Sequence, residues 1–134
     1  MGDPSISILT VDDEPGLAES IQMILISEGY SAFMEMDGYA AVNFCKANRP
    51  DVALIDVALG DKSINGLEVL KRVKELKPET ICVMITRMTD NETIETATKL
   101  GAFKYILKPL RPNDITFIAD EAAEIIRKRR VGNG

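Results

Sequence analysis

Apolar, β-branched segments alternate five times along the chain with segments whose apolar residues recur at helical spacing. This alternation is typical of successive β-α-β crossovers around a parallel sheet that is buried on both faces. Right-handed crossovers among five strands favour a doubly wound α/β fold, (βα)5, with the strand order 2-1-3-4-5. The strands are predicted at residues 6–11, 31–36, 52–56, 81–86 and 104–107.

The helices expected between these strands differ in their end signals and in their helix propensity. Gly29 is placed to end the first helix in a left-handed conformation, and Pro78 follows the third. Residues 91–100 contain three threonines and only a narrow apolar stripe, which lowers helix propensity. We expect this fourth helix to move most easily.

The length of the chain sets the domain organisation. Its 134 residues, 46% of them hydrophobic, suffice for one compact domain and not for two. We therefore predict a single domain over residues 1–134, with a core at about 6–128 and flexible ends at 1–5 and 132–134. No apolar run approaches the ~20 residues of a membrane span, and no signal peptide is visible, so we expect a cytoplasmic protein without membrane contact.

Composition excludes several classes of function. The chain has no histidine, which removes the usual general base of triad hydrolases and the usual zinc ligand. A net charge of −5 argues against direct nucleic-acid binding. The basic cluster at 127–130 fits the last turn of a helix better than a nucleic-acid or membrane contact. Cys45 and Cys82 lie in apolar segments and are predicted to be buried thiols.

The residues at the predicted carboxyl ends of the strands point to one site. Acids follow the first and third strands, a threonine ends the fourth and a lysine follows the fifth: Asp12, Asp13, Glu14, Asp56, Thr86 and Lys108. In doubly wound sheets, sites form at this edge, near the point where the strand order reverses. Clustered carboxylates repel one another unless a cation joins them. Oxygen ligands without histidine favour Mg²⁺ or Ca²⁺, and room for water and phosphate favours Mg²⁺.

Each of these residues also has a simpler interpretation. Asp13 fits the cap of a helix that begins at Pro15, and a lone lysine is usually solvated. The convergence of four strand ends on one edge favours the site.

The motifs at these strand ends resemble those of response-regulator receiver domains from two-component signalling, which have a flavodoxin-like fold. The matching segments are VDDEP at 11–15, LIDV at 54–57, MIT at 84–86 and YILKP at 105–109. Each is weak alone, but their order and spacing over about residues 6–128 make the resemblance strong.

The resemblance implies a role for each motif residue. Asp56 is the implied phosphoacceptor, and Thr86 and Lys108 are the implied ligands of the phosphoryl oxygens. The implied Mg²⁺ ligands are Asp13 directly, Asp12 through water, Asp56, and the backbone carbonyl of Ala58. A carboxylate that attacks phosphorus, with a metal and an amine to neutralise charge, is chemically sufficient for this role.

The resemblance also implies a switch and partners. Tyr105 is the implied switch aromatic, which moves inward when Thr86 meets the phosphoryl group, and the Lys108–Pro109 bond is expected to be cis. The phosphoryl donor is expected to be a histidine kinase or a histidine phosphotransfer protein. The output domain or downstream protein is expected at the face of the fourth helix, fifth strand and fifth helix. A second copy of the chain, in a homodimer, is a further expected partner. Catalysis is expected to be limited to self-catalysed phosphorylation and dephosphorylation.

The sequence departs from the family around the phosphoryl pocket. Gly60 stands where a proline is common, the usual glycine comes late at Gly66, and Arg87 replaces a small residue. We expect Arg87 and the longer 57–66 loop to shield an acyl phosphate from water. In the alternative, Arg87 points to solvent and pairs with an acid such as Asp61 or Asp90.

Three other classes of function compete with this one. A phosphatase of the haloacid-dehalogenase kind needs a second aspartate two positions after its nucleophile, a spacing that Asp12 and Asp13 lack. A flavodoxin-like nucleotide binder needs a glycine-rich loop after the first strand. A receiver-like adaptor that works without phosphorylation is the remaining alternative.

Overall fold

The computed structural model describes residues 2–60 and 63–132 and contains a five-stranded parallel sheet in the order β2-β1-β3-β4-β5. The strands are β1 (Ser7–Val11), β2 (Ser31–Glu35), β3 (Val52–Ile55), β4 (Ile81–Thr86) and β5 (Lys104–Leu107). The helices are α1 (Pro15–Ser27), α2 (Gly38–Asn48), α3 (Gly66–Leu76), α4 (Asn91–Lys99) and α5 (Pro112–Gly132). The predicted fold class and strand order are confirmed, and the strand bounds differ by at most one residue at an end.

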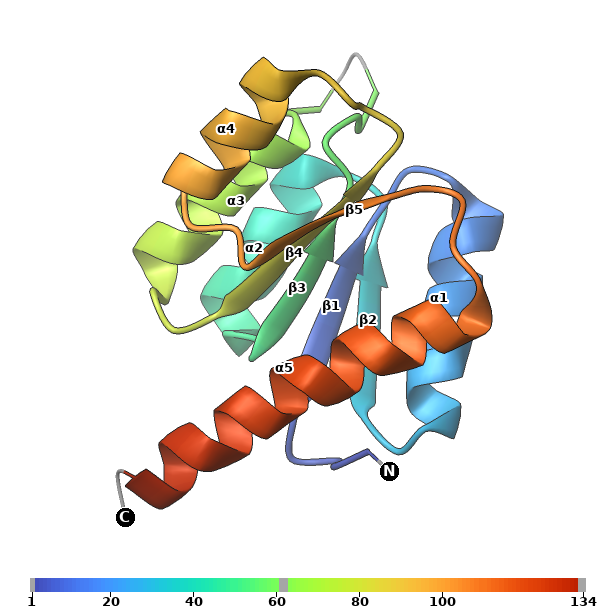
Figure 1. The fold of residues 1–134 in the computed structure, drawn as a ribbon, viewed down its shortest axis with the longest axis vertical. Helices are drawn as coiled ribbons and strands as arrows, with labels where there is room; N and C mark the ends of the chain where they lie inside the picture. The colour runs from blue at the N-terminus through green and yellow to red at the C-terminus, as the bar shows by residue number, and fades with distance from the viewer. Residues whose placement is uncertain (1, 61–62, 133–134) are drawn as a thin grey trace.

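Helices cover both faces of the sheet, with α2, α3 and α4 on one face and α1 and α5 on the other (Figure 1). Alternate residues of each central strand point to opposite faces, so neighbouring residues enter different cores. Leu54 packs in the core under α1 and α5, whereas Ala53 and Ile55 pack in the core under α2 and α3. The central strands are apolar at every position because both of their faces are buried.

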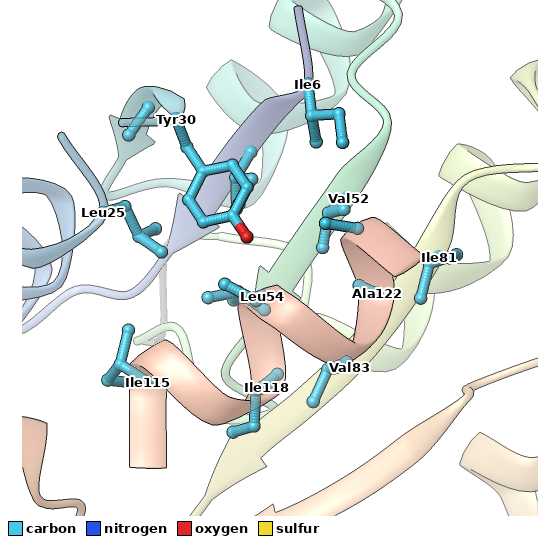
Figure 2. Packing of buried hydrophobic residues seen from close by; sticks show 14 of the residues in the cluster. Ile6, Leu25, Tyr30, Val52, Leu54, Ile81, Val83, Ile115, Ile118 and Ala122 are labelled. Carbon is cyan, nitrogen blue, oxygen red and sulfur yellow. The ribbon is translucent and has the colours of Figure 1, made fainter. Parts of the chain in front are cut away.

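The core under α5 is built mainly from aliphatic side chains of the helix and of the sheet. Figure 2 shows Ile115, Ile118 and Ala122 of α5 facing Leu54 and Val83 of the sheet. These five side chains are at most 4% exposed. Burial of aliphatic surface at about 25 cal/mol per Å² is the main force that holds the helix to the sheet.

The ends of the helices follow the local signals in the sequence. Pro15 and Pro112 begin α1 and α5. Backbone N–H groups in the first turn of a helix have no acceptor within the helix, so a proline there loses no hydrogen bond. Asp37 and Asp90 cap α2 and α4 through their side chains. Gly29 has a φ of 103°, so the predicted left-handed end of α1 is confirmed.

Both cysteines are buried free thiols, as predicted. Burial raises the pKa of Cys45 to about 11 and that of Cys82 to about 12. The two thiols are therefore apolar packing groups rather than reactive ones.

The basic end of α5 lies against the amino-terminal edge of the sheet. Arg127 is 3.8 Å from the carboxylate of Asp3, and Arg130 is 3.8 Å from that of Asp51. Arg130 also donates hydrogen bonds to the side chain and carbonyl of Ser5. These contacts hold the long helix to the domain, and they engage two arginines of the basic cluster within the chain itself. Within the described residues, no helix is long and apolar enough to cross a membrane.

Gly66 lies where α3 meets the strand end that carries Asp56. Its N–H donates to the carbonyl of Val57 at 2.8 Å, and a Cβ at this position would overlap the carbonyl oxygen of Asp56. The late glycine is therefore needed for close packing of the helix on the strand.

We expect Gly66→Ala to lower the free energy of unfolding by about 1–3 kcal/mol, because the added methyl forces α3 away from β3. Gly16→Ala is the matched control, since a Cβ at Gly16 would have no neighbour within 4 Å and the change is expected to be neutral or slightly stabilising. Urea unfolding of both variants measures the difference. Equal midpoints would show that the close approach at Gly66 is not a constraint.

Candidate functional site

The parallel register brings the predicted residues to one edge of the sheet. Val11 pairs with Ile55, so Asp12 and Asp56 follow neighbouring positions on adjacent strands. Thr86 pairs with Leu107 at the end of β5, directly before Lys108. Asp12, Asp56, Thr86 and Lys108 are all at most 8% exposed. Four polar side chains thus share a buried position at the carboxyl edge of the sheet.

Lys108 is the centre of this cluster. Its Nζ donates to Asp12 Oδ2 and to Asp56 Oδ2, both at 2.7 Å, and to Glu14 Oε1 at 3.3 Å. The Lys108–Pro109 peptide bond is cis. All three N–H groups of the ammonium are used, so the amine is neither solvated nor free.

Burial and pairing act in opposite directions on these charges. Burial lowers the pKa of Lys108, but hydrogen bonds to Asp12 and Asp56 outweigh it and raise the pKa above its ordinary value. Burial raises the pKa of Asp12, and the bond from Lys108 only partly offsets this. The ammonium therefore stays charged, while burial makes the charged form of Asp12 less favourable than it is in water.

Three carboxylates can contribute ligands to one cation. Single carboxylate oxygens of Asp12, Asp13 and Asp56 lie within 4.8 Å of one another. Asp13 does not cap α1, because the residue before that helix is Glu14 and no side chain caps it. Oxygen ligands at this spacing are suited to a hard divalent cation. The prediction of a cation site from the clustered acids alone is therefore consistent with the positions of these three side chains.

A pocket opens beside Asp56. Asp13, Ala58, Gly60 and Thr86 are among the residues that line it, and Asp56 Oδ1 accepts a hydrogen bond from the N–H of Ala58 at 3.1 Å. Gly60 has a φ of 84°, a conformation that favours glycine and brings the backbone next to Asp13. The pocket gives a ligand access to a carboxylate that is otherwise enclosed.

The described part of the longer loop contacts α2. Ser63 Oγ accepts a hydrogen bond from the N–H of Gly38 at 2.7 Å, and Ile64 packs in the adjoining core. Residues 61 and 62 lie outside the described residues, so the expected shielding of the pocket by this loop stays a prediction.

Thr86 and Tyr105 are connected through the loop after β4. The N–H of Met88 donates to Thr86 Oγ1 at 3.4 Å, and the hydroxyl of Tyr105 donates to the carbonyl of Met88 at 2.8 Å. Tyr105 is half-buried. A movement of Thr86 would therefore act on the residue that holds the tyrosine hydroxyl.

Arg87 has a partner that the sequence did not indicate. Its NH1 is 2.6 Å from Glu14 Oε1, whereas Asp90 uses its carboxylate to cap α4, and Asp61 lies outside the described residues. The alternative of an exposed Arg87 paired with an acid therefore describes the structure, with Glu14 rather than Asp90 as the acid. Glu14 and Arg87 follow β1 and β4, which β3 separates in the sheet, so only the length of both side chains lets them meet.

Together, the fold and this edge of the sheet define a class. A doubly wound five-stranded domain with buried acids, a threonine and a lysine at its carboxyl edge has the organisation of a receiver domain. The model of the response regulator receiver domain family matches residues 8–120. The chain belongs to this family and is a receiver domain of two-component signalling.

Individual relatives agree with this assignment. The nitrogen assimilation regulatory protein NtrX of Azorhizobium caulinodans is 37% identical over 92% of this chain and 27% of its own length. The transcriptional regulatory protein DltR of Streptococcus agalactiae is 36% identical over 91% of this chain and 50% of its own length. The chain thus spans half or less of these curated relatives.

Solved structures share the fold. A CheY-like receiver domain from Methanospirillum hungatei superposes with a TM-score of 0.84 and 27% identity, covering 92% of this chain and 98% of its own. NtrX of Brucella abortus gives a TM-score of 0.85 and 28% identity, over 95% of this chain and 29% of its own.

We expect Lys108→Met to destabilise the metal-free domain by about 3 kcal/mol, because Asp12 and Asp56 would lose their buried cation. Added Mg²⁺ should restore more stability to this variant than to the unaltered domain, since a metal ion no longer competes with the ammonium. Urea unfolding with chelator and with Mg²⁺ measures both effects. Lys104→Met is the control, because it removes a half-exposed pair with Glu121 and the longer contacts of the ammonium with the rings of Phe103 and Phe117, and it should cost only about 1 kcal/mol. Equal losses in the two variants would contradict the role of Lys108.

Proposed function

We propose that this receiver domain takes a phosphoryl group onto Asp56 from a histidine kinase or a histidine phosphotransfer protein. The observation that carries the proposal is the position of the Asp56 carboxylate, which borders a pocket and is held between Lys108 and the acids that follow β1. A carboxylate oxygen of Asp56 forms a bond to phosphorus as the bond to the donor breaks, and the donor leaves with the electron pair. Lys108 neutralises part of the charge on the transferred oxygens.

The donor set fits Mg²⁺ as the cofactor. We propose that Asp13 binds it directly, Asp12 through water, and Asp56 and the carbonyl of Ala58 as further ligands. When bound, the cation offsets the repulsion among the three carboxylates and the negative charge of the incoming phosphoryl group. The grouping of carboxylate oxygens from Asp12, Asp13 and Asp56 within 4.8 Å of one another supports this assignment.

Thr86 and Tyr105 are the proposed switch. The hydroxyl of Thr86 would leave the N–H of Met88 to donate to a phosphoryl oxygen, a contact that differs between the two states and so shifts their populations. Tyr105 would then lose its bond to the carbonyl of Met88 and move inward.

We further propose that the output acts at the face of α4, β5 and α5. This face carries exposed Phe103, Leu107 and Phe117, and α4 follows directly after the switch loop. The partner is an output domain, a downstream protein or a second copy of the chain. The receiver core is proposed to span about residues 6–128 of a single cytoplasmic domain.

Incubation with a small acyl phosphate and Mg²⁺ is expected to add one phosphoryl group to the domain, measured by intact mass. Asp56→Asn should abolish the addition, because an amide cannot form the acyl phosphate, and chelation of the metal should do the same. Asp51→Asn is the control, since Asp51 lies at the opposite edge of the sheet, paired with Lys77. Phosphorylation of Asp56→Asn at the unaltered rate would overturn the assignment, and no labelling of the unaltered domain would favour an adaptor that works without phosphorylation.

Hydrogen exchange is expected to change across residues 86–108 on phosphorylation, because the switch residues and α4 lie in this range. The amides of α1 and α2 serve as the internal control and should keep their exchange rates. A change confined to these two helices would place the output on another surface.

A further inference from the structure

The pair of Arg87 and Glu14 lies at the mouth of the proposed phosphoryl pocket. Both residues line the pocket with Asp56 and Thr86, and Arg87 directly follows Thr86 at the end of β4. Glu14 Oε1 accepts hydrogen bonds from two cations, Arg87 at 2.6 Å and Lys108 at 3.3 Å. One carboxylate therefore restrains both cations that face the acceptor site.

The contact between Arg87 and Glu14 is easily broken. The side chains are 64% and 44% exposed, and exposed ion pairs contribute little because water screens them. Lys108 is different, since its side chain is 1% exposed and bonded to two buried carboxylates. Of these two cations, Arg87 is the one that can change partner at low cost.

A phosphoryl group on Asp56 would be a stronger partner for Arg87 than Glu14 is. It carries nearly two negative charges and three acceptor oxygens, and a guanidinium binds such a group with two parallel hydrogen bonds. The bond to Glu14 is the main cause of the raised pKa of the Arg87 guanidinium, and the negative charges of Asp56 and Asp12 raise it further.

We propose that Arg87 is a phosphoryl-binding residue that Glu14 holds at the mouth of the pocket, and that phosphorylation of Asp56 transfers Arg87 from Glu14 to the phosphoryl oxygens. The proposal rests on the proposed function of Asp56. It adds a second displaced contact to the switch, because Glu14 loses its partner as Arg87 leaves. It also gives the phosphorylated state a cation at the side from which water reaches phosphorus.

Beryllofluoride, which mimics a phosphoryl group on a carboxylate, tests the proposal with Mg²⁺ present. Arg87→Ala should weaken its binding about tenfold, as expected for loss of a charge-assisted hydrogen bond. Arg87→Lys should recover part of the affinity, since it keeps the charge without the two-pronged geometry. Arg72→Ala is the matched control, because Arg72 forms a comparable exposed pair with Glu68 on α3 and should bind as the unaltered domain does.

A second pair of variants separates binding by Arg87 from simple repulsion by Glu14. Glu14→Gln removes the carboxylate, and the double variant Glu14→Gln with Arg87→Ala then lacks both groups. If Arg87 binds the phosphoryl group, the double variant should still bind beryllofluoride about tenfold more weakly than Glu14→Gln alone. Equal affinities would mean that Arg87 only neutralises Glu14, which would overturn the proposal.

The lifetime of the acyl phosphate gives an independent measurement. In hydrolysis, water attacks phosphorus, the bond to the Asp56 oxygen breaks, and inorganic phosphate and a proton are released. Arg87→Ala should lose phosphate several times faster than Arg72→Ala, and a crystal structure with beryllofluoride should place the Arg87 guanidinium on the fluorides. A guanidinium still on Glu14, or equal rates of loss, would overturn the proposal while labelling of Asp56 stays intact. An unaltered domain that takes neither beryllofluoride nor a phosphoryl group would overturn the function of Asp56 and this proposal together.

Discussion

The ammonium of Lys108 between Asp12 and Asp56 is the interaction on which the site depends. It joins the ends of three strands, because Asp12 follows β1, Asp56 follows β3 and Lys108 follows β5. Without a cation there, two buried carboxylates on adjacent strands would repel each other at the edge of the sheet. The same arrangement fits the proposed chemistry, since an ammonium already bonded to Asp56 would be in place to bind a phosphoryl group added there.

Around this rigid centre, the contacts become weaker toward the surface. Thr86 is buried but its hydroxyl accepts only a long hydrogen bond from Met88, and the pair of Arg87 and Glu14 is exposed. Weak contacts near a rigid centre are suited to a switch, because a new charge on Asp56 can replace them while the sheet stays intact. The packing of α5 and the bonds from its basic end hold that helix to the domain independently of the loop after β4.

Much of the fold was predictable from local signals. The alternation of strand and helix patterns predicted the topology, because a parallel sheet that is buried on both faces requires continuous apolar strands and crossover helices. Gly29 and Pro15 marked ends of α1, since their backbone preferences act without tertiary context. The requirement for glycine at position 66 was not predictable in this way. It arises because the carbonyl of Asp56, at the other end of the loop, lies where a Cβ would be.

By itself, the sequence determined the strand order and which residues stand at the carboxyl ends of the strands, because these follow from periodicity and from position along the chain. The motifs at those strand ends carried the resemblance to the receiver family. The tertiary structure decided which of these groups bind one another. Asp13 lines the pocket and does not cap α1. Lys108 donates hydrogen bonds to the carboxylates of Asp12 and Asp56, and Arg87 pairs with Glu14 rather than with Asp90. Side chains from strands that are distant in the sequence meet only through sheet register and side-chain reach, and hydrogen bonds depend on distances within a few tenths of an ångström.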